Sequence, residues 1–439
     1  QPLKGRQESK TEAELSDIPA RVDKVNVTGL KRTKKDYVHR VSDHLFKVNN
    51  FHDVLVECNN AKNYLKKLGI FKDVVVHIDV SKGKNKTPNG YEVTFDGTEL
   101  SPMTGQVGTE FGSNDGGLKI SLEAPNFAGR GERASVRAIR TTTSASDVAL
   151  TLLKPLHHTN FREYHPEISL SLFRNHLAFP YMACRTSNFG VLGEFNFSTP
   201  ALRLSHSLQY EASFRELFPM KGNVPFSVRE SSGPRMMSAC RLSTIYDIRD
   251  DPIFPTQGVY VKTTNELSGF GGDVSYISNT THGELNIPLP FDWVAQIVSK
   301  IGIIQGIRSP QILPISSLFS LGGPLNLRGF ELAGAGPHDQ EYANGVTSFW
   351  AIGLHLWMPM PYHRQCPNLI TNWRTHLFCN FGNCDSLNIN NMRIAIGAGL
   401  AIPIFQRARI EINWCIPINS QTNDRINPGI QFGIGTDFL

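Results

Sequence analysis

The residues best suited to specific chemistry lie in two motifs in the second half of the chain. The first, LGGPLNLRGF, covers residues 321–330 and has the composition of a loop. A buried arginine needs a carboxylate or another acceptor, so Arg328 would hold such a loop against a partner. The simpler alternative is a surface loop with one solvated arginine, and no Gly-Lys-Ser/Thr follows to make it a phosphate loop. The candidate residues are Arg328, Gly329 and Phe330, with Gly322 and Gly323 as supporting glycines.

The second motif, YDIRDDPIFPTQG, covers residues 246–258 and is rich in carboxylates. Its aspartates could suggest a metal site or an acid–base cluster. A tight turn between strands is favoured instead, because aspartates cap turns while prolines and a glycine fix their shape. The candidate residues of this turn are Asp247, Arg249, Asp250, Pro255 and Gly258.

No catalytic constellation accompanies these motifs. The 14 histidines are scattered, and neither HExxH nor a Gly-x-Ser-x-Gly elbow occurs. The 7 cysteines, Cys366 among them, form no disulfide framework, and this argues against the oxidising bacterial periplasm. Cys379 and Cys384 lack a second ligand pair at zinc spacing, so free thiols are favoured. We therefore expect no enzyme activity, no metal and no cofactor.

In the segments that must position the motifs, apolar and polar residues alternate with a period of two. In residues 408–416 the side chains Arg409, Glu411, Asn413 and Cys415 face away from Ile410, Ile412, Trp414 and Ile416. Residues 430–439 place Ile430, Phe432, Ile434, Thr436 and Phe438 on one face. Such alternation over hundreds of residues is typical of a transmembrane β-barrel, whose closed sheet satisfies its backbone in lipid. A pair of soluble β-sandwiches is the alternative.

Three regions are expected. Residues 1–20 read as a flexible polar tail. Residues 21–100 read as a β-α-α-β-β domain with helices over 34–45 and 50–68. Residues 101–439 suffice for about 16 antiparallel strands at about 20 residues each. The predicted fold is therefore mainly β, a transmembrane antiparallel barrel preceded by one small α/β domain. No transmembrane helix is expected, because no apolar run reaches about 18 residues.

The charge is concentrated in the small domain. Residues 21–100 hold 15 Lys and Arg against 10 Asp and Glu, which equals the +5 of the whole chain. A mildly basic domain suits anionic lipid head groups or acidic client segments. Nucleic acid is not expected, because no basic stripe with interleaved aromatics occurs. The domain is either a spacer or a docking module that adds a client strand to its sheet edge.

These motifs together resemble the BamA-type outer-membrane assembly superfamily, and within it the core barrel of the mitochondrial sorting-and-assembly machinery. Residues 21–100 are similar to a POTRA domain, and a single such domain together with the cysteines favours the mitochondrial branch. Residues 321–330 match the family's Arg-Gly-Phe loop, which folds into the barrel, and 246–258 match its Asp-x-Arg-Asp turn. Residues 378–383 match a strand that in bacterial members carries Phe-x-Asp-x-Gly. Asn380 replaces that aspartate here, so Glu411 is a candidate substitute partner for Arg328.

The resemblance implies insertion and assembly of β-barrel precursors in the mitochondrial outer membrane, with the N-terminal domain in the intermembrane space. Its implied partners are barrel precursors, membrane lipids and accessory subunits of an assembly complex. A passive channel, or a tether between the outer and inner membranes, is the alternative.

The implied mechanism uses a seam between the first strand, about 104–111, and the last, 430–438. Glycines contribute no side-chain packing, so the seam should be weak, and its opened edges would template client strands. The candidate gate residues are Thr104, Gln106, Gly108, Gln431, Gly433 and Gly435.

Overall fold

The computed structural model describes residues 18–439 except 40–43, 83–86, 113–114, 143–144, 157–163, 221–223, 309–312, 361–372, 386–390 and 405–407. Most of the expected N-terminal tail, and Cys366, lie outside the described residues. The chain divides into two compact units. The first contains the residues up to Gln106 together with 121–136 and 151–162, and the second contains the rest. No helix in the described part of the chain is long and apolar enough to cross a membrane.

The N-terminal residues form the β-α-α-β-β module that the sequence predicts. Its elements are β1 (Arg21–Thr28), α2 (Lys35–His39), the 3-10 turn η2 (Leu45–Lys47), α3 (Phe51–Lys67), β2 (Phe71–Val80) and β3 (Gly90–Glu99). The strand order is β1-β3-β2, with β3 parallel to β1 and antiparallel to β2. The two outer strands therefore present the edges of this small sheet.

Helix α3 packs on the sheet through one apolar stripe. Val54, Cys58 and Leu65 are buried together with Val25 and Val93, as expected for side chains at helical spacing. From its apolar character and helical spacing Leu55 would be expected to join this stripe, but its position on the helix turns it outward and leaves it 38% exposed. Leu68 caps the helix, and Gly69 follows with a φ of 64°, the left-handed conformation that ends many helices.

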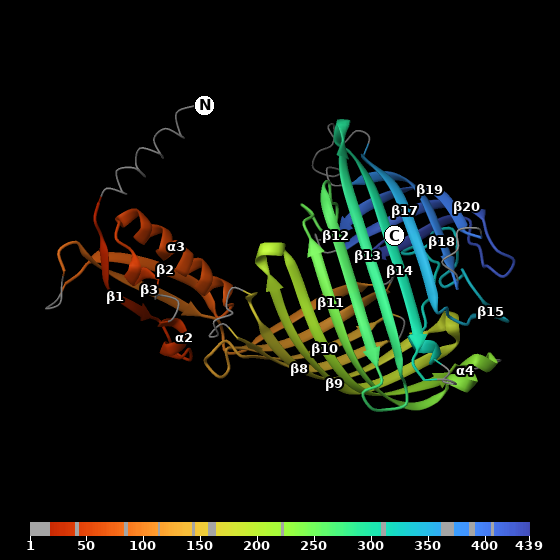
Figure 1. Cartoon of the computed structure of the whole chain (residues 1–439), viewed down its shortest axis with the longest axis horizontal. Helices are drawn as coiled ribbons and strands as arrows, with labels where there is room; N and C mark the ends of the chain where they lie inside the picture. Colours follow the sequence, from red (N-terminus) through yellow and green to blue (C-terminus); the bar gives the residue numbers. More distant parts are fainter. Residues whose placement is uncertain are drawn as a thin grey trace. The chain divides into compact units, whose positions relative to one another are not determined.

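Sixteen of the remaining strands form one sheet, which confirms the predicted strand number, and the other two pair with each other as a small separate sheet. The order is sequential from β4 to β21, with β14 beside β17; Figure 1 labels the strands of this sheet from β8 to β14 and from β17 to β20. Each register determined between β8 and β21 is antiparallel. The strands are β4 (Thr104–Gly112), β5 (Asp115–Pro125), β6 (Arg133–Thr141), β7 (Ser146–Pro155), β8 (Glu167–Phe179), β9 (Cys184–Thr199), β10 (Leu204–Pro219), β11 (Gly233–Asp247), β12 (Gly258–Ser268), β13 (Tyr276–Leu289), β14 (Trp293–Gly306), β17 (Ser348–Pro359), β18 (Arg374–Cys384), β19 (Arg393–Ile404), β20 (Ala408–Asn419) and β21 (Gly429–Gly435).

Short elements lie in the connections. They are η4 (Pro180–Met182), η5 (Pro200–Leu202), α4 (Phe226–Ser231), η6 (Pro290–Asp292), η7 (Ile315–Ser317), β15 (His338–Asp339) and β16 (Tyr342–Ala343). The last three belong to the long connection between β14 and β17, which also carries the Arg-Gly-Phe motif. Phe330 in this connection is fully buried and packs with Leu327, Leu321 and Val298.

The two faces of the sheet separate apolar from polar side chains as predicted. On β20 Trp414 is exposed, whereas its neighbours Asn413 and Cys415 are fully buried. On β21 Ile430 and Phe432 are likewise exposed. The prediction that Phe438 shares the face of Ile430 and Phe432 is wrong. β21 ends at Gly435, and Phe438 turns inward, where it is 4% exposed.

Within the first unit, the turn between β5 and β6 binds the loop after β1. Asn126 Nδ2 donates to Thr33 Oγ1 (2.8 Å), while its Oδ1 accepts from the Gly131 amide (2.7 Å). Glu99 accepts from Thr33 Oγ1 and from the amides of residues 31–33. Burial raises the pKa of the Glu99 carboxyl, but these hydrogen bonds outweigh burial and hold the pKa below its ordinary value.

We expect Asn126→Ala to loosen this connection. The change leaves the buried Gly131 amide unpaired, and alanine strains the left-handed backbone at φ 56°, so the local cost is about 1–3 kcal/mol. Hydrogen exchange should speed up in peptides covering residues 31–36 and 126–132. Asn60→Ala, which removes only an exposed bond to Glu57, is the control. Equal exchange in the two variants would show that the connection does not depend on Asn126.

Candidate functional site

The Arg-Gly-Phe loop lies against the inner face of the large sheet and is hydrogen-bonded to its last strand, β21. The Gly329 amide donates to Gln431 Oε1 (3.1 Å), and Gln431 Nε2 donates to the Phe330 carbonyl (3.1 Å). Gly329 has a φ of 85°, and an added side chain would stand 3.1 Å from the Ala395 Cβ. Glycine is therefore required here both by the backbone conformation and by the close approach to β19. The surface-loop alternative for Arg328 is wrong, since this residue is 0% exposed.

Arg328 is neutralised by Glu411 of β20. Its Nη2 lies 2.7 Å from Glu411 Oε2, and both side chains are fully buried. The guanidinium also stands 5.0 Å from the centre of the Phe378 ring. This contact confirms Glu411 as the carboxylate partner of Arg328, in place of the aspartate that Asn380 replaces. A buried pair of this kind is costly to break, because either partner alone would be an uncompensated charge.

Glu411 serves a second arginine as well, and so the pair extends into a cluster. Arg409 Nε lies 2.9 Å from Glu411 Oε1, and Asn413 Nδ2 donates to Glu411 Oε2 at 3.0 Å. His376 Nε2 is 2.8 Å from Asn413 Oδ1, and His376 Nδ1 is 3.2 Å from His355 Nδ1. We call these six residues the interior cluster: Arg328, His355, His376, Arg409, Glu411 and Asn413.

The Asp-rich motif is a turn, as favoured from its sequence. Asp250 accepts hydrogen bonds from the amides of Thr256 (2.9 Å) and Gln257 (3.2 Å), and Asp251 accepts from Ile253 (2.6 Å). Arg249 pairs with Asp247 (2.9 Å) and with Glu284 of β13 (2.8 Å). The carboxylates are thus used in capping and pairing, and the shape of the turn brings its apolar residues to the interior cluster.

Contact between the two motifs runs through Arg409. Its Nη1 donates to the Ile253 carbonyl (2.9 Å), and its guanidinium stands 5.9 Å from the Phe254 ring centre. The structure therefore brings together the loop, the turn and β21. The other predicted gate residues, Thr104, Gln106 and Gly108, lie on β4 at the opposite end of the sheet order.

The glycines of β21 pack against the loop. A side chain added at Gly433 would stand 3.0 Å from the Phe438 ring and 3.4 Å from Leu325, and one at Gly435 would stand 3.5 Å from Leu325. There is therefore a second physical reason for glycine at positions 433 and 435, besides weak cross-strand packing. They leave the space that the loop and residues 436–439 fill.

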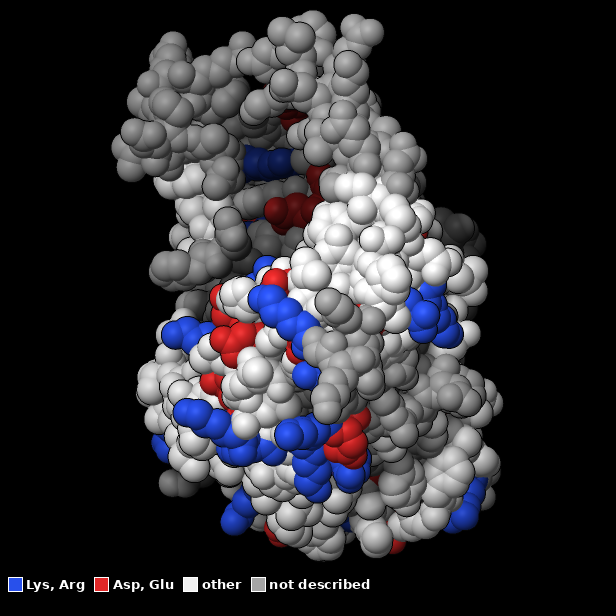
Figure 2. Space-filling view, turned by 90° about the vertical axis from the view of Figure 1, so that its left-hand side faces the viewer, with Lys and Arg blue, Asp and Glu red and all other residues white. Residues whose placement is uncertain are grey.

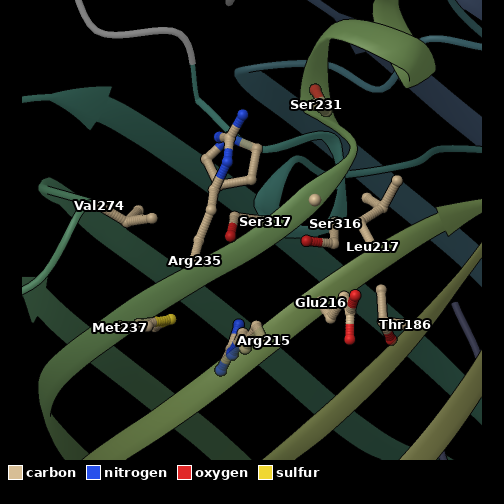
Figure 3. A pocket seen from close by; sticks show the side chains of 12 residues that line it. Thr186, Arg215, Glu216, Leu217, Ser231, Arg235, Met237, Val274, Ser316 and Ser317 are labelled. Atoms are coloured by element: carbon tan, nitrogen blue, oxygen red, sulfur yellow. The ribbon is translucent and has the colours of Figure 1, made fainter.

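A second polar region lines β10–β13. Arg241 pairs with Glu211 (2.7 Å) and Glu266 (2.8 Å), and Tyr276 Oη donates to Glu266 (2.8 Å). Nearby, Figure 3 shows a cavity between Arg235, Leu217 and Ser316, whose volume of about 20 Å³ has room for little more than one water. In the described part of the chain, no group of three or more His, Cys, Asp or Glu residues could hold a metal ion.

Sequence reasoning missed the histidine pair, Trp357 and Lys300. His376 shares the inward parity of β18 with Phe378, two residues further on, and Trp357 shares that of β17 with His355. The sequence could have indicated them as polar or aromatic side chains on the inward face of a strand. Which of these strands lie next to one another in the barrel, however, is known only from the strand pairing. Trp357 stacks on His376 with 4.1 Å between ring centres.

Comparisons with known proteins agree with this architecture. Residues 126–438 match the Omp85 superfamily domain. A SAM50-like protein of Drosophila melanogaster is 48% identical over 97% of this chain and 96% of its own length. The human sorting and assembly machinery component 50 homolog is 34% identical, over 95% of this chain and 90% of its own.

Solved structures share the fold. BamA from Haemophilus ducreyi lacking POTRA domains 1–3 superposes with a TM-score of 0.79 at 18% identity, covering 95% of this chain and 84% of that one. The resemblance found in the motifs is thus confirmed by family, relatives and fold. The chain belongs to the Omp85 superfamily and, within it, to the family of the sorting and assembly machinery component 50 homologues.

Proposed function

We propose that this protein inserts and assembles β-barrel precursors in the mitochondrial outer membrane, as the barrel subunit of an assembly complex. The names of its relatives and the fold shared with BamA support this role. The observation that carries it is the sheet order, which begins with β4 and ends with β21. These two strands are the edges that a client could use, and backbone pairing needs no cofactor or ATP.

The interior cluster would keep one of these edges in place. Gln431 on β21 is bonded to the Arg-Gly-Phe loop, and the loop is held by the pair of Arg328 and Glu411. The β21 edge is thus anchored from inside the barrel, while its outward face stays apolar. A client strand could pair with an edge held in this way and remain next to lipid as its own barrel grows.

The N-terminal domain would receive precursors in the intermembrane space. Its sheet has two edge strands, β1 and β2, at which an extended segment could add by backbone pairing. The face in Figure 2 carries Lys and Arg side chains mixed with Asp and Glu, and the excess of five positive charges in residues 21–100 suits acidic client segments. Contacts with membrane lipids and accessory subunits belong to the same proposal.

A channel role is disfavoured by what fills the interior. Leu327, Phe330 and Leu439 form an apolar core there with Val298 of β14 and Ala351 of β17. A porin-type pore needs a wetted path, which an apolar core of this kind obstructs. The tether role is compatible with assembly and needs no separate site.

Depletion of the protein from mitochondria tests the proposed function. Newly imported barrel precursors should then accumulate unassembled, while helical outer-membrane proteins insert normally. Re-expression of the chain should restore barrel assembly. Normal assembly of barrels after depletion would contradict the proposal.

We also expect deletion of residues 21–100 to impair client handling more than barrel folding. The strands of the large sheet bond to one another, so their hydrogen bonds do not depend on the β1-β3-β2 sheet. Heat-modified gel mobility would report barrel folding, and precursor insertion into proteoliposomes would report client handling. A truncated chain that cannot fold its barrel would contradict this division of roles.

A further inference from the structure

The outer face of β8, β9 and β10, which lie side by side in the sheet (Figure 1), carries a hollow. Its volume is about 400 Å³, and it is lined by Arg174, Ser187, Phe189, Phe214 and Glu216. Phe189 is 60% exposed and Phe214 is 51% exposed. Asn188 and Ser213, which neighbour them along the strands with the opposite parity, are buried. The hollow therefore opens on the outward, apolar face of the sheet.

The lining residues form two rows across the three strands. In the first row Arg174 pairs with Phe189, and Phe189 pairs in turn with Phe214. In the next row Ser187 pairs with Glu216. Paired residues on one face of a sheet have Cβ atoms about 4.5–5.5 Å apart. The guanidinium of β8 and the carboxylate of β10 therefore lie diagonally across the hollow, with the side chains of β9 between them.

Neither of these two charges is neutralised by the protein. Among the described residues, Arg174 and Glu216 form no ion pair, whereas on the inward face Arg215 lies 2.8 Å from Glu211. A basic side chain on the lipid face of a barrel costs about 2–4 kcal/mol at the bilayer midplane and about 0–1 kcal/mol near the interface. Unpaired charges on this face are therefore expected at the level of the lipid head groups.

The apolar band of β9 ends at the hollow. Its outward residues within 189–197 are Phe189, Val191, Gly193, Phe195 and Phe197. A strand needs about 9–11 residues to cross the hydrocarbon core of a membrane, so this stretch is about one crossing long. Ser187 is the next outward residue, and it is polar. The hollow thus lies where the acyl chains of a lipid meet its head group.

The outer surface stays open beyond the two rings, on the side of the apolar band. A side chain added at Gly193 would meet, among the described residues, only the Tyr210 carbonyl, at 4.0 Å. On β10 the residue between Phe214 and Tyr210 with the same parity is Ala212, which is also small. An acyl chain that starts at the hollow therefore has room to lie against the sheet.

We propose that this hollow binds a zwitterionic phospholipid with a primary ammonium group, the chemistry of phosphatidylethanolamine. Arg174 and Ser187 hold the phosphate, and Glu216 accepts charge-assisted hydrogen bonds from the ammonium. The rings of Phe189 and Phe214 pack on the glycerol and the first methylene groups. The proposal rests on the proposed function only for the location of the barrel in a membrane, and it goes beyond that function by assigning a lipid site away from both edge strands.

The charge pattern also accounts for selectivity among phospholipids. A quaternary ammonium, as in phosphatidylcholine, has no N–H to donate to Glu216. An anionic head group without an amine, as in phosphatidylglycerol, gains from Arg174 but leaves the carboxylate unpaired. Only a head group that carries both a phosphate and a primary ammonium satisfies the two charges together.

Native mass spectrometry of the full-length protein, titrated in detergent with single dioleoyl phospholipids, tests the site. The protein should retain phosphatidylethanolamine about tenfold more tightly than phosphatidylcholine, because only the former makes the hydrogen bonds to the carboxylate. Arg174→Gln should weaken retention of both lipids. Glu216→Gln should remove the preference and leave the retention of phosphatidylcholine unchanged. Heat-modified gel mobility would verify that each variant is folded.

Arg203→Gln is the matched control. Arg203 is also an exposed arginine of the β9–β10 hairpin, but it follows η5 at the opposite end of these strands and does not line the hollow. This variant should keep both the affinity and the preference of the parent. Equal retention of the two lipids by the unaltered protein, or a preference that survives Glu216→Gln, would overturn the site.

Two further measurements separate this inference from its alternatives. If Glu216→Gln retains lipids like the parent but loses an accessory subunit on extraction from mitochondria, the hollow is a protein contact and the lipid site is overturned. If the unaltered protein inserts precursors into proteoliposomes but shows no lipid preference, the site is overturned and the assembly function stands. Lipid preference without any precursor insertion would support the site and contradict the assembly function.

Discussion

Glu411→Gln should destabilise the barrel more than any single change in its arginine partners. Glu411 is the carboxylate partner of both Arg328 and Arg409, so the amide would leave two buried guanidinium groups without a carboxylate. Loss of one partner of a buried ion pair costs about 3–5 kcal/mol. Arg328→Ala should cost less, because Glu411 keeps Arg409 and Asn413. Denaturant unfolding followed by heat-modified gel mobility would measure both variants.

An exposed ion pair is the matched control. Arg137 lies 2.9 Å from Asp147 on neighbouring strands, but its side chain is 45% exposed. Arg137→Ala should therefore change stability by only about 0–1 kcal/mol. If Arg328→Ala proves as damaging as Glu411→Gln, the sharing of one carboxylate by two arginines is not what holds the cluster together.

Gly329→Val should unseat the Arg-Gly-Phe loop. A left-handed conformation costs a residue with a side chain about 1–2 kcal/mol, and the added atoms would collide with the Ala395 Cβ at 3.1 Å. Once the loop is displaced, Gln431 loses its bonds to Gly329 and Phe330. Precursor insertion by the reconstituted protein should then fall strongly, while the variant still enters membranes. Insertion assays on protein recovered from the membrane fraction measure this.

Gly193→Ala tests whether substitution of any glycine in the barrel would reduce precursor insertion in the same way. On β9 a side chain added at Gly193 would meet, among the described residues, only the Tyr210 carbonyl, at 4.0 Å. This variant should insert precursors like the parent. A Gly329→Val protein with full activity and an intact loop, shown by unchanged protease resistance of residues 321–335, would contradict the role given to the glycine.

The strands could be predicted because alternation is a local property. Glu411 and Trp414 fall on opposite faces from their positions along β20 alone, and the same parity predicted one shared face for Ile430 and Phe432. Phe438 was misplaced because parity assumes that a strand continues. The strand ends at Gly435, and the reason lies in tertiary contacts of Asp437 and Leu439 that no local pattern records.

The site was only partly predictable for a related reason. The motif residues Arg328 and Asp250 stood out by composition and spacing. Lys300, His355 and His376 did not, because they belong to no motif and their strands carry other polar residues as well, such as Gln296 on β14 and Asn380 on β18. The contacts of these residues depend on which strands face one another across the interior. That arrangement depends in turn on the closure of the whole sheet.

The seam itself is tested by cross-linking β4 to β21. Cysteine pairs placing Gln106 or Gly108 opposite residues 431–435 would join the two edge strands, and several combinations are needed to find the register. A control pair at Ile412 and Phe432 joins β20 to β21, which are already hydrogen-bonded partners. A lock there leaves the edges free.

Precursor insertion by the cross-linked, reconstituted protein is the most direct measurement of the central claim. If clients are templated between the first and last strands, the β4–β21 cross-link should abolish insertion, reduction should restore it, and the β20–β21 control should insert normally throughout. Undiminished insertion by protein whose β4–β21 bond is verified by mass spectrometry would contradict templating at this seam.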